Sequence, residues 1–185
     1  MLSWLLGASG VLWVAVELRQ AFHTRPEARS ADRGSRPIIG VVGLAGGLIA
    51  LYVSRTFPEL AVPDRTVAAW CALPLLWAGT ALRLWSFRTL GHYFTFTVQT
   101  SPDQRVVTTG PYRFVRHPAY SALLLAMVAV GLLIGNWLSL LVLVGAVTAA
   151  LVYRIRVEER ALERAIGPAY REYAATRKRL VPFVW

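Results

Sequence analysis

Two apolar runs, AYSALLLAMVAVGLLI (residues 119–134) and WLSLLVLVGAVTAALVY (residues 137–153), are separated only by Gly135 and Asn136. Glycine and asparagine tolerate the left-handed backbone conformation in which helices commonly end. The pattern therefore predicts a tight antiparallel helical hairpin. Each run is shorter than the roughly 20 residues of an ideal membrane span, so we expect partial shielding by protein or local thinning of the bilayer.

Three further apolar runs precede the hairpin, at residues 2–22, 38–53 and 67–85. Hydrophobic residues make up 56% of the 185-residue chain and the mean hydropathy is +0.48, which exceeds what an ordinary soluble domain buries. We therefore expect an all-α integral membrane protein of about five transmembrane helices. The first run lacks a preceding basic segment and a small-residue cleavage site, so it is interpreted as a retained span and not as a signal peptide.

The glycines of the second run, Gly40, Gly43, Gly46 and Gly47, suit close contact between helices. A nucleotide-binding loop is disfavoured because no strand precedes them. The charged stretch after residue 153 keeps a helical pattern and predicts a cytoplasmic amphipathic helix, broken near Gly167.

The basic residues indicate an orientation in the membrane. The net charge is +10, but the Lys and Arg side chains gather between and after apolar runs, which favours membrane topology over nucleic-acid binding. In a five-span arrangement 18 of the 20 basic residues fall on one side. By the positive-inside rule the N-terminus is then outside and the C-terminus is cytoplasmic.

Polar residues that membrane insertion does not explain gather on the predicted cytoplasmic side. One group runs from Gly110-Pro111-Tyr112 to Arg116-His117-Pro118-Ala119-Tyr120. Because Pro118 opens a helix, we expect free backbone N–H groups there that could bind a carboxylate or a hydroxyl-rich ligand, flanked by His117 and Tyr120.

A second polar group contains Arg154 and Glu158, which are four residues apart and share one helix face. The plainer alternative is a surface ion pair of little energetic consequence. His117 could equally be a helix cap or an interfacial anchor, and the tyrosines could form an interfacial belt. The run from Arg177 to Arg179 could be a topology signal or a contact to anionic lipid.

No zinc-binding spacing, catalytic triad, Walker loop or dinucleotide fingerprint is present, and Cys71 is the single cysteine. No metal site, nucleic acid or protein partner is therefore predicted. From the residues alone, the chain is a membrane protein with a cytoplasmic polar pocket.

The order and spacing of these motifs resemble the isoprenylcysteine carboxyl methyltransferase family over roughly residues 94–183. The resemblance rests on the two polar groups, on the hairpin between them, and on Glu159, Leu162, Gly167, Tyr170, Tyr173 and Pro182. Five spans are similar to the small prokaryotic members. Ala122 stands where the family usually has glycine, so a small residue is retained. The resemblance divides the chain into a three-span bundle at residues 1–90 and a methyltransferase core at residues 91–185.

The resemblance implies a cytoplasmic site for S-adenosyl-L-methionine, with S-adenosylhomocysteine as product, and a lipidic or prenylated small substrate that arrives from the bilayer. Arg154 would position the substrate and act with Glu158 in catalysis. The implied cofactor contacts are Gln99, Gln104, Arg105, Val106, Val107, Tyr112, His117, Pro118, Ala119, Tyr120 and Glu158.

The methyl acceptor most consistent with Arg154 is a carboxylate. A carboxyl group ordinarily titrates near pH 4, so at neutral pH it is ionised and attacks without a general base, and catalysis reduces to positioning, desolvation and electrostatics. The alternatives are a phospholipid amine or a small thiol. An amine would need a proton acceptor, for which Glu159 is the main candidate beyond Glu158. A non-catalytic membrane scaffold or a small transporter is a further alternative.

Overall fold

The computed structural model describes residues 1–21, 29–30, 35–91, 99–100, 105–182 and 184–185. Six α-helices dominate it: α1 (Leu2–Ala21), α2 (Ser35–Thr56), α3 (Arg65–Leu90), α4 (Pro118–Ile134), α5 (Trp137–Ile166) and α6 (Pro168–Thr176). Two short 3₁₀ helices, η1 (Pro58–Leu60) and η3 (Gly110–Arg113), lie in the links. Strands β1 (Arg29–Ser30) and β2 (Gln99–Thr100) form one antiparallel pair.

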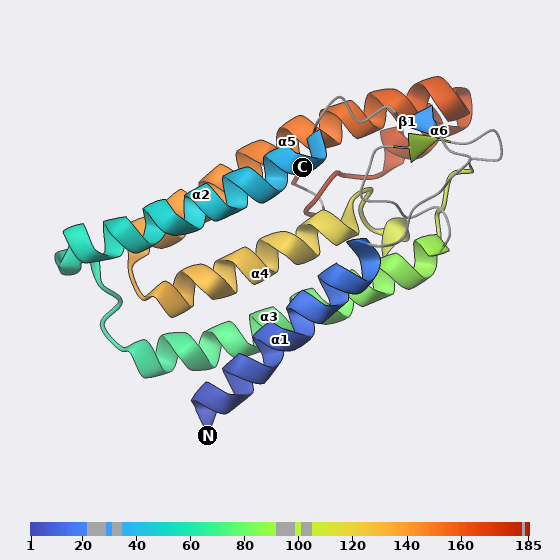
Figure 1. Ribbon diagram of the computed structural model, residues 1–185. Helices are drawn as coiled ribbons and strands as arrows, with labels where there is room; N and C mark the ends of the chain where they lie inside the picture. The colour runs from blue at the N-terminus through green and yellow to red at the C-terminus, as the bar shows by residue number, and fades with distance from the viewer. Residues whose placement is uncertain (22–28, 31–34, 92–98, 101–104, 183) are drawn as a thin grey trace.

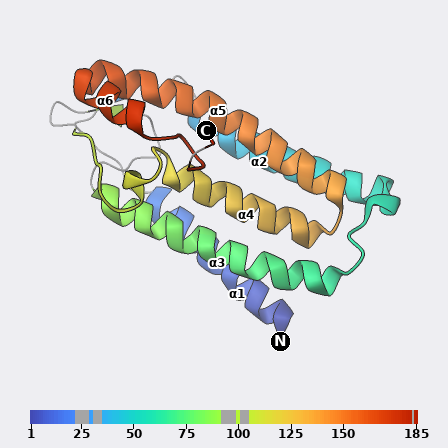
Figure 2. The same ribbon diagram turned by 180° about the vertical axis from the view of Figure 1, so that it is seen from behind.

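The long helices lie side by side along one bundle (Figure 1). Helix α3 packs against α4, α2 packs against α5, and α4 packs against α5, while α1 covers α3. The view from behind shows the same neighbours (Figure 2). The α2–α3 link and the α4–α5 turn share one end of the bundle, called here the turn end, and α6 lies at the opposite end.

The predicted hairpin is confirmed. Gly135 has a φ of 75°, in the left-handed region, and its N–H donates to the Gly131 carbonyl. Asn136 begins α5 as an N-cap, because its Oδ1 accepts a hydrogen bond from the Ser139 N–H at 3.0 Å. Its side-chain amide also donates to the Phe57 carbonyl at 2.8 Å, which ties the turn to the α2–α3 link.

The helices fit a membrane environment. Four of the described helical segments are long and apolar enough to cross a bilayer: Leu2–Arg19, Ile38–Thr56, Arg65–Leu90 and Trp137–Ile166. Helix α4 is apolar but has only 17 residues. Large apolar side chains such as Trp4, Leu44 and Leu141 are exposed on the outside of the bundle, as expected for contact with lipid. The prediction of an all-α membrane protein is confirmed.

The fifth apolar run does not form a short helix of its own. It continues without a break through the charged stretch, and the two together form the 30 residues of α5. The helix ends only at Gly167, with a φ of 72°, and Pro168 then opens α6. The helix goes on past Arg154 because no helix-breaking residue follows until Gly167, so its charged last turns extend beyond the apolar part that suits the bilayer.

Small residues let α3 and α4 approach closely. A Cβ added at Gly79 would lie 2.9 Å from the Ala122 carbonyl oxygen, and Ala122 itself is fully buried. The alanine at this position therefore fits where a larger side chain would not. In the second span the expected glycine packing holds for Gly46, which faces Ala146 of α5, whereas Gly40, Gly43 and Gly47 have open space beside them.

Candidate active site

The chain that leads into α4 is held by the segment that follows α6. The Arg116 N–H donates to the Lys178 carbonyl at 2.8 Å, and the His117 N–H donates to the Arg179 carbonyl at 2.9 Å. The Ser121 hydroxyl adds a bond to the Leu180 carbonyl. These bonds fix the start of α4 against a stretch about 60 residues away in the sequence.

A partly buried hydrogen-bond chain joins α4 to α5. The Arg154 Nε donates to the Tyr120 hydroxyl at 2.7 Å, and that hydroxyl donates to Glu158 Oε2 at 2.7 Å. Arg154 is only 4% exposed. The interpretation of Arg154 and Glu158 as a surface pair is therefore wrong, because the arginine is buried between helices and Tyr120 stands between the two charges. Charge-assisted bonds of this length are among the stronger hydrogen bonds in proteins.

A second cluster surrounds Glu159. His117 Nε2 lies 3.2 Å from Glu159 Oε1, and Arg116 lies 3.3 Å from the same oxygen. Arg179 contacts Oε2 at 2.9 Å and 3.0 Å through two guanidinium nitrogens. The His117 ring stacks on Tyr120 with centroids 5.6 Å apart, so the two clusters form one continuous site.

His117 is neither a side-chain cap nor an interfacial anchor. It occupies the N-cap position of α4 but makes no side-chain capping bond, and it is 5% exposed. The expected free N–H groups at this helix start are partly used, since the N–H groups of Tyr120 and Ser121 both donate to the His117 carbonyl. Ligand binding here therefore depends more on side chains than the proline motif predicts.

The charge of Glu159, in the charged last turns of α5, is fixed by its neighbours. Burial by itself would raise the pKa of this carboxyl, but hydrogen bonds with His117 and Arg179 outweigh burial and lower the pKa to about 2. Glu159 is thus a carboxylate at neutral pH and a very weak proton acceptor. It serves as the anchor that holds α5 to the start of α4.

Tyr112 of η3 and Tyr173 of α6 are uncharged side chains at the contact between these two elements. The Tyr173 hydroxyl donates to the Tyr112 carbonyl at 2.7 Å, which joins α6 to η3. Burial raises the pKa of Tyr112 well above its ordinary range and raises the pKa of Tyr173 to about 12. Both phenols therefore stay protonated at physiological pH.

Arg83 and Glu17 form an ion pair that the sequence analysis missed. Arg83 Nε lies 2.6 Å from Glu17 Oε1, and a second guanidinium nitrogen donates to the Ala119 carbonyl at 2.6 Å. Arg83 is 4% exposed, so one buried cation links α1, α3 and the first turn of α4. In the sequence, the only indication of this ion pair was that two opposite charges lie inside or beside apolar runs.

The structure brings some of the predicted site residues together at one end of the bundle, and the others lie in the preceding link, in β2 or outside the described residues. Tyr112, His117, Pro118, Ala119, Tyr120, Arg154 and Glu158 lie on the elements that meet at this end of the bundle. Arg105 is exposed and Val106 and Val107 are half-buried in the link before η3. Gln99 lies in β2, paired with Ser30. Gln104 lies outside the described residues.

The described residues contain no group of three or more His, Cys, Asp or Glu side chains that could hold a metal ion. The apolar helices and the polar site at their end define a multi-pass membrane protein with an active-site-like cluster of buried ionisable side chains.

Comparison with known proteins gives the family. The model of the isoprenylcysteine carboxyl methyltransferase family matches residues 72–164. The chain therefore belongs to this family, as predicted, and the matched region begins inside α3.

Several relatives carry the same kind of name. Protein-S-isoprenylcysteine O-methyltransferase B of Arabidopsis thaliana is 32% identical over 114 residues, which cover 60% of this chain and 58% of the relative. A probable protein-S-isoprenylcysteine O-methyltransferase of Oryza sativa subsp. indica is 27% identical over 187 aligned positions, covering 98% of this chain and 96% of the relative. The Saccharomyces cerevisiae protein-S-isoprenylcysteine O-methyltransferase is 31% identical over 145 residues, covering 74% of this chain and 60% of the relative.

Proposed function

We propose that this protein transfers the methyl group of S-adenosyl-L-methionine to the carboxylate of an isoprenylcysteine-like or other lipidic acceptor. Family membership supports the reaction class. The observation that carries the choice of acceptor is the buried Arg154, hydrogen-bonded through Tyr120 to Glu158 beside the start of α4. A buried cation at the edge of an apolar bundle suits an anionic acceptor with an apolar tail.

The residues around Glu158 fit the cofactor. S-adenosyl-L-methionine supplies an electrophilic methyl group on a sulfonium cation when it is bound. Glu158 has one oxygen bonded to Tyr120 and is 30% exposed, so it retains accepting capacity for amino or hydroxyl groups. The aromatic ring of Tyr120, which stacks on His117, would favour a nearby cation. The other residues that would hold the cofactor are Gln99, Gln104, Arg105, Val106, Val107, Tyr112, Pro118 and Ala119.

Arg154 would hold and orient the acceptor carboxylate. The carboxylate is already ionised at neutral pH, so the protein needs no general base. The buried position of Arg154 strengthens its attraction for an anion, because water screens the charge poorly there. The bond to the Tyr120 hydroxyl restricts the guanidinium rotamer and prepares the site before substrate binds.

The structure gives less support to an amine acceptor. Such an acceptor must lose a proton, and Glu159, the main candidate base, has its pKa lowered to about 2 by its neighbours. Its two oxygens are committed to His117, Arg116 and Arg179. The proposal therefore keeps a carboxylate as acceptor.

The proposal extends to topology and organisation. The site is placed on the cytoplasmic side with the N-terminus outside, following the distribution of basic residues. Residues 1–90 would serve mainly as the membrane bundle and residues 91–185 as the methyltransferase core. The α3 residue Arg83 reaches from the first part into the second through the Ala119 carbonyl.

Binding and transfer are tested separately on the purified protein in detergent. S-adenosyl-L-methionine and S-adenosylhomocysteine should both raise the melting temperature. Radiolabelled methyl should pass to a farnesylcysteine analogue and not to an ethanolamine phospholipid, and base treatment should release the label from the ester. Absence of any stabilisation by either compound would refute the enzyme assignment.

The variant Arg154→Ala should abolish ester formation while S-adenosylhomocysteine still stabilises the protein. Arg156→Ala is the matched control, since Arg156 lies two residues further along α5 with an exposed side chain. If Arg154→Ala loses cofactor binding together with activity, Arg154 is structural and its role in holding the acceptor is wrong.

A further inference from the structure

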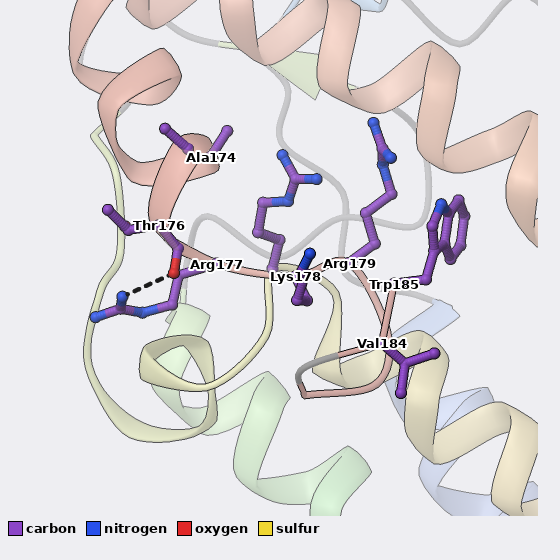
Figure 3. A pocket seen from close by; sticks show the side chains of 9 residues that line it. Ala174, Thr176, Arg177, Lys178, Arg179, Val184 and Trp185 are labelled. Carbon is purple, nitrogen blue, oxygen red and sulfur yellow. Dashed lines mark hydrogen bonds between the residues drawn. The ribbon is translucent and has the colours of Figure 1, made fainter.

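A hollow beside the C-terminal segment adjoins the site described above and shares Arg116 and Arg179 with it. It has a volume of about 220 Å³, and none of Tyr120, Arg154 and Glu158 lines it. Its lining comes from α6, the following segment and the residue before His117: Arg116, Ala174, Ala175, Thr176, Arg177, Lys178, Arg179, Val184 and Trp185. Figure 3 shows Arg177, Lys178 and Arg179 following one another along the chain, with Trp185 beside Arg179.

The lining is strongly cationic. Four of the nine lining residues are basic and none is acidic. Glu159 neutralises part of the charge of Arg116 and Arg179 from the other side. Within the part of the chain that the structure describes, Arg177 and Lys178 make no ion pair, so the excess positive charge is concentrated on these two side chains.

Two guanidinium nitrogens of the lining lack acceptors. Arg116 Nε and Arg177 Nε are buried and have no hydrogen-bond partner among the described residues. Among the described residues, the Arg177 side chain makes one bond, from a terminal guanidinium nitrogen to the Thr176 carbonyl at 3.1 Å. Buried donors without acceptors are costly, so a ligand that supplies oxygen acceptors would be stabilised here.

We propose that this hollow binds the phosphate of an anionic phospholipid. The planar guanidinium groups of Arg116 and Arg177 match phosphate oxygens in geometry, and Lys178 adds a point charge. The apolar part of the lining, Val184 and Trp185, distinguishes a lipid from a free anion, because Val184 is 72% exposed and would contact the lipid beyond its phosphate. Tryptophan also favours the interface between membrane and water.

The bound phosphate would act on the neighbouring site through the backbone. The carbonyls of Lys178 and Arg179 hold the N–H groups of Arg116 and His117, and the Arg179 side chain holds Glu159. A ligand that fixes the C-terminal segment therefore also stabilises the start of α4. The hollow itself does not depend on methyl transfer, so its test needs no turnover.

The test measures the melting temperature of the full chain in a neutral detergent at constant ionic strength. Dioctanoyl phosphatidylglycerol should raise it in a saturable manner, whereas dioctanoyl phosphatidylcholine and inorganic phosphate should not. In the double variant Arg177→Gln, Lys178→Gln the apparent affinity should fall about 10- to 30-fold, as expected from two surface cations near an anionic lipid. Arg55→Gln, Arg65→Gln removes the same charge at the turn end and should keep the native affinity.

Four results would overturn the proposal, three of them from comparing ligands and double variants. Equal stabilisation by inorganic phosphate would make this a site for free anions, equal stabilisation by phosphatidylcholine would remove the role of charge, and equal loss in both double variants would reduce the effect to net charge. The single variant Lys178→Gln still tests the proposal if the double variant misfolds, because the Lys178 side chain is exposed. It should fold normally and lose about fivefold in affinity for phosphatidylglycerol, and an unchanged affinity would also contradict the proposal.

Discussion

The polar residues at the two ends of the α4–α5 hairpin make different kinds of hydrogen bond. At the turn end, Asn136 and Ser139 are fully or almost fully buried, and their side chains bond to backbone groups: Asn136 to Phe57 and Ser139 to Ala50. At the site end, partly buried bonds join ionisable side chains to one another. Neutral bonds to backbone give a rigid turn, whereas linked charges give a polarised surface that can bind a charged ligand.

The largest effect should come from Arg83. Arg83→Ala leaves Glu17 without its partner and removes the bond to the Ala119 carbonyl, so we expect a loss of about 3–5 kcal/mol in the free energy of unfolding. Equilibrium unfolding in detergent measures this change in the free energy of unfolding. The double variant Arg83→Leu, Glu17→Leu should recover much of the stability. If the single variant costs less than the turn-end variant Asn136→Ala, the contrast between the ends is wrong.

Tyr120→Phe tests the chain of linked charges with a minimal change. Removing the hydroxyl deletes both bonds that join Arg154 to Glu158, so methyl transfer should fall about 10- to 100-fold with the loss of these two charge-assisted hydrogen bonds. Turnover of a farnesylcysteine analogue gives the rate, and thermal stabilisation by S-adenosylhomocysteine gives cofactor affinity. Tyr153→Phe, on the exposed surface of α5, is the control. Activity equal to that of the control would mean that the hydroxyl has no positioning role.

Asn136→Ala probes the turn end. It removes the N-cap of α5 and the bond to Phe57, which should cost about 1–2 kcal/mol of stability. Because the site lies at the other end of the bundle, the affinity for S-adenosylhomocysteine should be unchanged at a temperature where the variant is folded. Isothermal titration at low temperature checks this. A matching loss of cofactor affinity would show that the two ends are coupled.

The smallest effect concerns Glu159 and pH. Its folded-state pKa of about 2 lies below the ordinary value of 4.5, so its contribution to stability is present above pH 4.5 and is lost as the pH falls from 4.5 toward 2. The wild type should therefore lose about 1 kcal/mol more than Glu159→Gln between pH 5 and about pH 3.5. Melting temperatures of the two proteins over this range give the difference. Parallel pH curves would mean that the cluster does not hold this carboxylate.

Local pattern was enough to predict much of the fold. The Gly135-Asn136 pair predicted the hairpin, and the apolar runs predicted the membrane helices. The four-residue spacing of Arg154 and Glu158 placed them on one helix face, but it did not indicate that Tyr120 would lie between them. The length of the fifth helix was underestimated, because hydropathy marks where apolar residues stop and not where a helix ends.

By itself the sequence determined the membrane class, the hairpin, the family resemblance and the chemistry available at the site. These depend on composition, periodicity and short motifs, which act between residues close in the chain. Only the tertiary structure decided that Glu159 is an anchor, that Glu17 reaches Arg83, and that the C-terminal segment holds the start of α4. Each of these contacts joins residues 20 or more positions apart, and packing of whole helices selects such partners from many charged candidates.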